Sequence, residues 1–297
     1  MSRSARKRAA LRAGMASDTA VVAIGAHDAL TARMAADYGF GAVWVSGLAV
    51  ATMTYAIPDV NLTTMNETLD QAVRFDRATE LPVVTDCDNG FGGLNNVVRT
   101  LESFDAAGIA AISIEDNLFP KRNSLLGADT RRELLPMAEQ ARRLKAAKRA
   151  QETDDFVLIA RVESLIAGHG VEDACARADA YVEAGVDAIL IHSRDKTLAE
   201  IEGFLGSWKG LGSVPLVCVP TLFPSFTAAE LSAKGFDLVI LANQVMRAAV
   251  GAMETTLERL AVSGRAADVD GDIVPVDHIF DLVDTKAAIA LEDEGLV

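Results

Sequence analysis

Eight short apolar runs recur along the chain, and they constrain what it can fold into more than any other feature. They are rich in Val and Ile, are bounded by Gly, Pro or Asp, and start near residues 21, 41, 82, 110, 156, 187, 214 and 237. Runs of this length and composition are typical of β-strands buried on both faces, as in a parallel sheet.

Amphipathic segments lie between these runs, with apolar residues at intervals of three and four, and many of them end in Gly. Such spacing predicts helices that a glycine terminates. The clearest are DALTARMAADYG (28–39), NVVRTLESFDAAG (96–108) and EDACARADAYVEAG (172–185). Strand and helix therefore alternate eight times, which predicts an α/β fold of the TIM type, a (β/α)8 barrel, rather than a doubly wound sheet.

The series is not interrupted by a linker rich in Pro, Ser or Gly, so we expect a single domain over residues 1–297. From about residue 252 the chain has more helical sequence than a closing barrel helix requires, and we expect this extension to pack on a partner subunit. The basic start, MSRSARKRAALRAG, has no apolar core typical of a secretory signal. A capping helix or a frayed terminus is expected there.

Composition excludes several classes of function. The net charge of −14 argues against a general affinity for nucleic acid or for anionic membrane surfaces. No apolar run reaches the roughly 18 residues of a membrane span. The three cysteines are far apart and form no C-x-x-C pair, so neither a disulfide framework nor a zinc site is indicated. We expect three buried thiols in a cytoplasmic protein.

In a barrel of this type the functional site lies at the carboxyl ends of the strands, and acidic residues follow the third and fourth runs. Asp86 and Asp88 point to the same side of their strand, and Glu115 ends the next one. Carboxylates that converge in this way repel each other unless a cation lies among them, and hard oxygen ligands suit Mg2+. The alternative is a turn with solvated acids.

Cationic and polar side chains end other runs. Arg161 and His192 each close a strongly apolar stretch, where a guanidinium and an imidazole could bind phosphoryl or carboxylate oxygens. The structural alternative is an ion pair between Arg161 and Glu163, with a buried histidine bonded to backbone. After the second run, Ser46 and the backbone amides that follow it could hold a small carboxylate.

With these residues located, the chain resembles the phosphoenolpyruvate mutase/isocitrate lyase superfamily, in its phosphonopyruvate-handling branch. The resemblance runs through GAHDALTARMA, WVSGLAVA, the YAIPD of 55–59, TDCDNGFG, EDNLFPKRNSL, ARVESLIAG and ILIHSR. It implies a barrel that exchanges its terminal helix between the subunits of a homodimer or homotetramer. It also implies Mg2+ as cofactor and a small anion, phosphoenolpyruvate or phosphonopyruvate, as substrate.

The resemblance also assigns roles to individual residues. Asp86 matches a direct Mg2+ ligand, and Asp88 and Glu115 match carboxylates that hold its waters. The residues matched to the reaction itself are Asp59, Lys121, Asn123, Arg161 and His192. Those matched to substrate binding are Trp44, Ser46, Gly47, Leu48, Ser124 and Leu125. Ser124 lies with Lys121 and Asn123 in what would be a gating loop.

The loop after Glu115 separates the chemistries of this superfamily. Lyases that resemble isocitrate lyase carry a Lys-x-Cys-Gly-His motif there, and this loop has neither Cys nor His. Phosphonopyruvate hydrolases place Thr at the position of Asn123, so the loop favours a mutase that interconverts phosphoenolpyruvate and 3-phosphonopyruvate. Asn117 departs from the Lys usual in such mutases. The alternatives are a phosphonopyruvate hydrolase, a C–C lyase of a small dicarboxylate, and a metal-binding barrel that serves as a scaffold.

Overall fold

The structure of the chain is a computed structural model, which describes residues 1–127, 130 and 132–295. It consists of two compact units, Met1–Asn243 and Gln244–Val297. The first unit holds all the strands and the second is helical. We expected the C-terminal extension to start near residue 252. The boundary between the two units lies earlier in the chain, because the helix that follows the last strand begins at Gln244.

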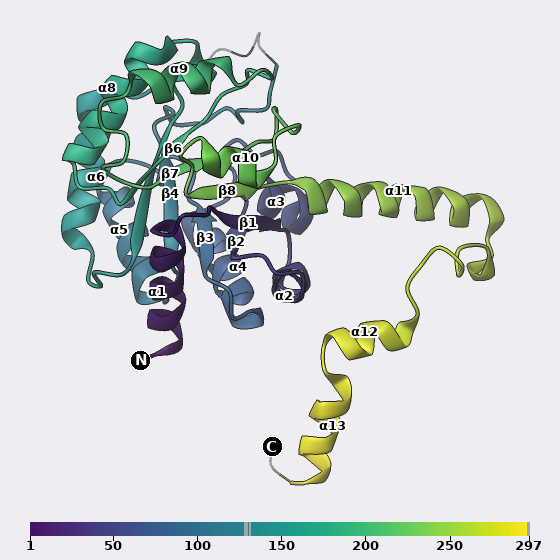
Figure 1. Cartoon of the computed structure of the whole chain (residues 1–297). Helices are drawn as coiled ribbons and strands as arrows, with labels where there is room; N and C mark the ends of the chain where they lie inside the picture. Colours follow the sequence, from purple (N-terminus) through teal and green to yellow (C-terminus); the bar gives the residue numbers. More distant parts are fainter. Residues whose placement is uncertain (128–129, 131, 296–297) are drawn as a thin grey trace. The chain divides into compact units, whose positions relative to one another are not determined.

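The first unit is a closed barrel of parallel strands in sequence order, in which the last strand pairs with the first (Figure 1). Each of the eight apolar runs forms one strand, so the predicted (β/α)8 architecture is confirmed. The strands are β1 (Val21–Ala26), β2 (Ala42–Val45), β3 (Val83–Asp86), β4 (Ala111–Glu115), β5 (Val157–Val162), β6 (Ala188–Ile191), β7 (Leu216–Cys218) and β8 (Leu238–Leu241).

Helices cover the outside of this barrel, and several begin at a capping residue. The Thr64 and Thr227 hydroxyls accept bonds from the third helical amide, and the Glu side chain at that position bonds back, which satisfies amides that a helix start leaves unpaired. The helices of this unit are α1 (Arg3–Met15), α2 (Ala29–Asp37), α3 (Gly47–Ala49), η1 (Val50–Thr54), α4 (Met65–Ala78), α5 (Leu94–Ala106), α6 (Met137–Ala150), α7 (Ser164–Ala167), α8 (Gly170–Glu183), α9 (Ala199–Ser207) and α10 (Ala228–Ala233).

The barrel interior is filled by side chains from alternate positions of each strand. On β5 these are Val157 and Ile159, and on β6 they are Ala188 and Leu190. The two-residue period follows from strand geometry, in which successive side chains point to opposite faces. The same period sets the direction of the residues that follow each strand, and so determines which side chains reach the mouth of the barrel.

Helix α1 packs against this interior. Of the two structures expected for the basic N-terminus, the capping helix is the one observed. Leu11 and Met15 belong to the same buried cluster as the inward side chains of the strands. The Arg8 guanidinium is buried, lies 3.0 Å from the Asp105 carboxylate and donates to the backbone oxygen of Ile109. The basic residues at the start of the chain therefore have structural partners.

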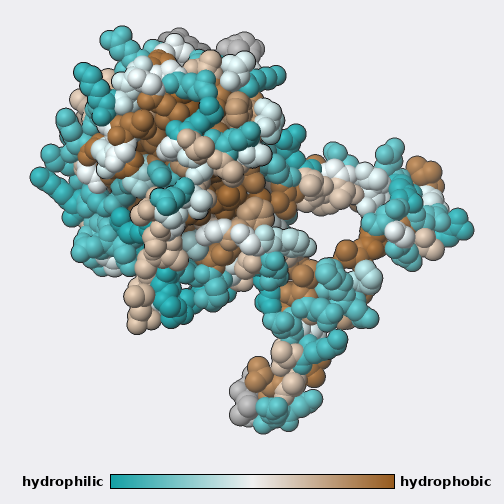
Figure 2. All heavy atoms as spheres, viewed as in Figure 1, coloured by the Kyte–Doolittle hydropathy of each residue, from teal (hydrophilic) through white to brown (hydrophobic). Residues whose placement is uncertain are grey.

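The second unit consists of α11 (Gln244–Ser263), the short η2 (Ala266–Asp268), α12 (Val276–Leu282) and α13 (Thr285–Asp293). Its surface carries many large apolar side chains, some of which are visible in Figure 2. The exposed ones are Met253, Leu257, Val262, Ile273, Val274, Val276, Ile279, Phe280, Val283, Ile289 and Leu291. No helix in the described part of the chain is long and apolar enough to cross a membrane.

The cysteines are all free, as expected, and two of them are fully buried. Cys87 and Cys218 lie on or directly after strands of the barrel, whereas Cys175 on α8 is only partly buried. The expectation of three buried thiols is therefore corrected for Cys175, because its position on a surface helix leaves part of the side chain in contact with solvent.

If α1 is an integral part of the core, Leu11→Ala should lower the free energy of unfolding by about 2–5 kcal/mol, the usual cost of truncating a buried leucine. Urea denaturation followed by circular dichroism measures this change. Leu211→Ala is the matched control, because Leu211 is exposed. A variant of Leu11 that is as stable as this control would contradict the role of α1.

Candidate active site

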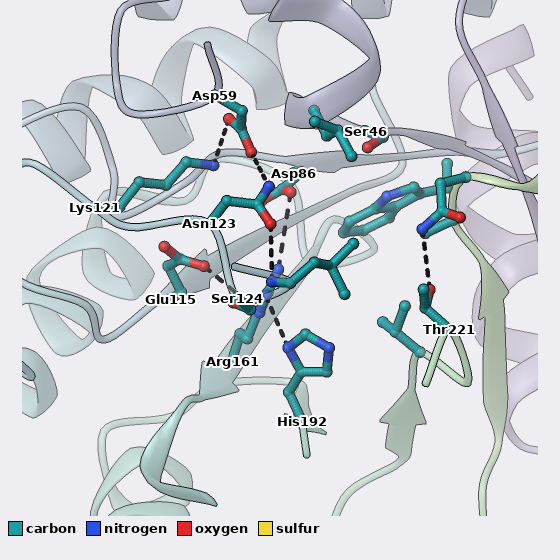
Figure 3. A pocket seen from close by; sticks show the side chains of 16 residues that line it. Ser46, Asp59, Asp86, Glu115, Lys121, Asn123, Ser124, Arg161, His192 and Thr221 are labelled. Carbon is teal, nitrogen blue, oxygen red and sulfur yellow. Dashed lines mark hydrogen bonds and ion pairs between the residues drawn. The ribbon is translucent and has the colours of Figure 1, made fainter. Parts of the chain in front are cut away.

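The candidate site lies at the carboxyl ends of the strands and is built from the inward positions of the barrel. Asp86 is two residues beyond the inward Val84 on β3, Arg161 is two beyond Ile159 on β5, and His192 is two beyond Leu190. The alternation that fills the core with apolar side chains thus aims polar ones into the mouth. Figure 3 shows them converging on one cavity.

The cavity has a volume of about 50 Å3 and contains most of the residues predicted from the sequence. Twelve of the fourteen predicted site residues line it: Trp44, Ser46, Leu48, Asp59, Asp86, Glu115, Lys121, Asn123, Ser124, Leu125, Arg161 and His192. The other two lie directly behind this lining. A Cβ atom added to Gly47 would lie 3.0 Å from Asp88 Oδ1.

Lys121 joins the carboxylates on one side of the cavity. Its ammonium lies 2.8 Å from Asp59 Oδ1 and also contacts Asp88 Oδ1. Burial raises the pKa of Asp88 to about 6, although Lys121 opposes this shift. Burial disfavours the charged amine, but Asp88 and Asp59 outweigh it and raise the pKa of Lys121 well above its usual value. At neutral pH this side therefore contains one ammonium between carboxylates.

On the opposite side, Glu163 connects Arg161, His192 and Ser124. Glu163 Oε1 lies 2.5 Å from Arg161 Nε and 2.9 Å from His192 Nδ1, and Oε2 accepts a 2.7 Å bond from the Ser124 hydroxyl. Glu163 is fully buried. Burial opposes its ionisation, but Arg161 and His192 hold its pKa well below the usual value. The ion pair considered as a structural alternative therefore exists, and it also orients two side chains that line the cavity.

A loop at residues 118–127, called the lid loop below, covers the cavity and turns the side chains of Lys121, Asn123 and Ser124 inward. Asn123 Nδ2 donates a 2.5 Å bond to Asp59 Oδ2, and Ser124 bonds to Glu163. Arg132 holds the backbone from outside, because its guanidinium donates to the backbone oxygens of Asn123 and Leu126. The predicted gating loop is thus in contact with both sides of the cavity.

Asn117, the position at which the sequence departs from the motif it resembles, lies beside the carboxylates. Its side chain is buried, and Nδ2 donates a 2.9 Å bond to Glu115 Oε1. A neutral amide therefore stabilises one oxygen of Glu115 without adding positive charge. The net charge around these carboxylates is therefore more negative than it would be with a lysine at this position.

The donor set fits a divalent metal ion. Asp86, Asp88 and Glu115 converge, and burial raises the pKa of Glu115 to about 8, with Arg161 and Lys121 opposing the shift. A nearby cation would offset this burial penalty. Gly47 leaves the space beside these acids free of a Cβ atom. In the described residues, no three His, Cys, Asp or Glu side chains are placed to bind a metal unaided.

Some residues of the site were not singled out by the sequence. Glu163 was predicted only as an ion-pair partner, and Asn61, which bonds to Asp88 and to the backbone of Lys121, had no sequence signal. Thr221 and Asn243, which the sequence places after the seventh and eighth apolar runs, also line the cavity, together with Val219 and Ala242, which it did not single out. The inward direction of Val219, Thr221 and Ala242 follows from Val217 on β7 and from Ile240 on β8, whereas Asn243 is out of phase with this two-residue period.

Comparison with known proteins supports the resemblance found in the sequence. The family model described as phosphoenolpyruvate phosphomutase matches residues 11–261. The phosphonopyruvate hydrolase of Variovorax sp. (strain Pal2) is 41% identical over 287 residues, which are 96% of this chain and 98% of the relative.

Two solved structures extend the similarity to the whole fold. A phosphoenolpyruvate phosphomutase from Streptomyces platensis subsp. rosaceus superposes with a TM-score of 0.92 at 39% identity, over 98% of this chain and 99% of that one. A phosphonopyruvate hydrolase in complex with oxalate and Mg2+ superposes with a TM-score of 0.88 at 38% identity over all of both chains. The chain therefore belongs to the phosphoenolpyruvate phosphomutase family, as its motifs predicted.

Proposed function

We propose that this protein is a Mg2+-dependent phosphoenolpyruvate mutase, which interconverts phosphoenolpyruvate and 3-phosphonopyruvate. The observation that carries this proposal is the position of Asn123. Its amide lies in the cavity, bonded to Asp59 on one side, and its carbonyl oxygen accepts a 2.9 Å bond from the backbone of Leu125. An amide fixed in this way covers the cavity from the lid loop. The resemblance implies that hydrolases have Thr at this position.

Moving a phosphoryl group from oxygen to carbon within one molecule requires no net proton transfer. The protein must hold the two fragments in register and stabilise their negative charge. Arg161 and His192 would bind the migrating phosphoryl group, and Asn123 would donate to it from the lid loop. Ser46, with the backbone at Gly47 and Leu48, would hold the pyruvate carboxylate under Trp44. All of these except Gly47 line the cavity.

His192 has a protonation state that suits this role. Burial and then Arg161 lower the pKa of His192, so the ring is neutral at neutral pH when no anion is bound. Its Nδ1 lies 2.9 Å from Glu163 Oε1, which can only accept, and 2.9 Å from Arg161 Nη2, which can only donate, so this nitrogen contacts both members of the buried ion pair. An anionic phosphoryl group beside the ring would favour the imidazolium, in which both nitrogens donate.

The carboxylates would hold the metal. When bound directly by Asp86, with Asp88 and Glu115 holding its waters, Mg2+ would supply positive charge that stabilises an enolate oxygen. Lys121 would neutralise Asp59 and Asp88 and keep the lid loop over the cavity, since its ammonium contacts both. Exclusion of water by this loop would prevent hydrolysis of the transferring group.

Phosphonopyruvate hydrolase is the second candidate, and a specific observation favours it. The Variovorax hydrolase is 41% identical to this chain over nearly the full length of both. The same metal and phosphoryl residues would serve a hydrolase, which differs by admitting water to the phosphoryl group. The two activities would therefore share these residues and differ at the lid loop, at the position of Asn123, and they are distinguished by their products.

We further propose that the second unit packs on another copy of this chain, as the resemblance implies. Its exposed apolar side chains, among them Leu257, Ile279, Phe280 and Ile289, form more apolar surface than a small helical segment retains in water. Exchange of this segment between subunits of a homodimer or homotetramer would bury them.

If Asp86 is the direct metal ligand, Asp86→Asn should abolish turnover of phosphonopyruvate at every Mg2+ concentration that the assay allows. The amide has no charge to bind the ion, whereas the size of the side chain is unchanged. Asp37→Asn on the surface of α2 is the matched control and should be fully active. Turnover near the wild-type rate in the Asp86 variant would remove this metal assignment.

If Asn123 separates rearrangement from hydrolysis, Asn123→Thr should raise the ratio of pyruvate to phosphoenolpyruvate formed from phosphonopyruvate by about tenfold, which corresponds to about 1.4 kcal/mol. The shorter side chain loses the bond to Asp59 and leaves room for water. Product analysis by chromatography measures this ratio, with Asn95→Thr on exposed α5 surface as the control. An unchanged ratio would exclude Asn123 as the residue that discriminates.

If Glu163 orients the phosphoryl-binding side chains, Glu163→Gln should reduce kcat/KM by about 100-fold or more, or about 2.7 kcal/mol of transition-state stabilisation. The neutral amide cannot balance the charge of Arg161. Its NH2 group would face either the Arg161 guanidinium or the Ser124 hydroxyl, both of which donate to Glu163 in the wild type. Steady-state kinetics on phosphonopyruvate give the value. Glu183→Gln, at an exposed position on α8, should behave as wild type; equal kinetics in both variants would contradict the role of Glu163.

A further inference from the structure

Asn61 lies between the lid loop and the metal-side carboxylates, and it contacts both with one amide group. Its Oδ1 accepts a 2.5 Å bond from the backbone amide of Lys121. Its Nδ2 donates a 3.0 Å bond to Asp88 Oδ2. Asn89 supports the amide through two longer contacts, of 3.3 and 3.4 Å.

The neighbours of Asn61 fix the direction of its amide. If the oxygen and nitrogen were exchanged, two donors would face each other at Lys121 and two acceptors would face each other at Asp88. Only the orientation described satisfies both contacts. The backbone of Asn61 has φ +61°, a left-handed conformation that Asn tolerates better than most residues. The loop thus carries a residue suited both to its backbone conformation and to this bridge.

The carboxylate of Asp88 is held at both oxygens by groups whose positions depend on the lid loop. Oδ1 contacts the Lys121 ammonium, and Oδ2 accepts from Asn61, which in turn holds the Lys121 backbone. The first contact requires Lys121 at its place over the cavity, and the second is made by a side chain that Lys121 and Asn89 hold together. Displacement of the lid loop would therefore remove the direct partner of one oxygen and the shortest of the bonds that hold the partner of the other.

We propose that Asn61 is a positioning residue that couples closure of the lid loop to the orientation of Asp88. The proposal rests on the proposed function in one respect, that Asp88 holds waters of the metal ion. Closure would bring Lys121 onto Asn61, and Asn61 would then fix Asp88 in the orientation that supports metal binding. Metal binding would in turn favour the closed loop, because coupling between two sites is reciprocal.

Asn61→Gly tests the coupling without straining the loop, since glycine adopts a positive φ freely. Hydrogen exchange measured by mass spectrometry reports protection of the peptide containing residues 118–127, with and without Mg2+ and oxalate. Loss of the Lys121 contact should increase exchange there by about five- to tenfold. The dissociation constant for Mn2+, measured by electron paramagnetic resonance, should rise by about tenfold or more, as for other residues that orient metal-binding side chains.

Two further variants separate this role from a general loosening of the loop. Ala56→Gly changes an exposed residue of the same segment that also has a positive φ, and it should leave both readouts at wild-type values. Asn61→Asp keeps an oxygen facing the Lys121 amide and should restore protection of the lid loop to within about twofold of wild type. Wild-type values of both readouts in Asn61→Gly, or equal changes in the two glycine variants, would overturn the proposal.

The readouts do not depend on which reaction the protein catalyses. A protein that hydrolyses phosphonopyruvate instead of rearranging it should give the same shifts in exchange and in Mn2+ affinity. A wild-type protein that does not bind Mn2+ would contradict the metal assignment of the proposed function. Exchange in the metal-free lid loop would still test the bond between Asn61 and Lys121.

Discussion

The alternation of side chains along parallel strands, closed into a barrel, is the constraint on which the rest of the structure depends. Every second residue must point inward, and near the N-terminal end and the middle of the barrel these residues are apolar and pack with Leu11 and Met15 of α1. Continued toward the mouth, the same positions are Asp86, Arg161 and His192. The protein therefore builds its core and its site from one repeating geometry, with the change from apolar to polar placed at the strand ends.

Charge is distributed unevenly across the site, and this unevenness relates the fold to the chemistry. On one side, carboxylates outnumber cations, since Lys121 lies between Asp59 and Asp88, and Arg161 is 3.9 Å from Asp86 and 3.6 Å from Glu115. On the other side, Glu163 balances Arg161 within a buried ion pair. The first side is suited to a cation and the second presents donors to an anion. A small substrate with a carboxylate at one end and a phosphoryl group at the other would satisfy both.

Much of this arrangement was predictable from the sequence, because it follows from local periodicity. All eight strands were located from apolar runs, and the direction of Asp86 follows from its place on β3, whereas Asp88 lies beyond the strand at φ +48°. The contacts of the lid loop were not predictable, since its path depends on Arg132 and on residues distant in the chain, such as Asn61 and Glu163. A residue in a loop at positive φ has no periodic signal, and its partners are decided by tertiary structure alone.

The central claim, that this site rearranges a phosphoryl group and does not hydrolyse it, is tested most directly by 31P NMR of the purified protein with Mg2+ and phosphonopyruvate. We predict that the phosphonate resonance decreases while that of phosphoenolpyruvate increases, with no equivalent release of inorganic phosphate. Conversion of phosphonopyruvate to inorganic phosphate, without phosphoenolpyruvate, would contradict the account and identify the protein as a hydrolase.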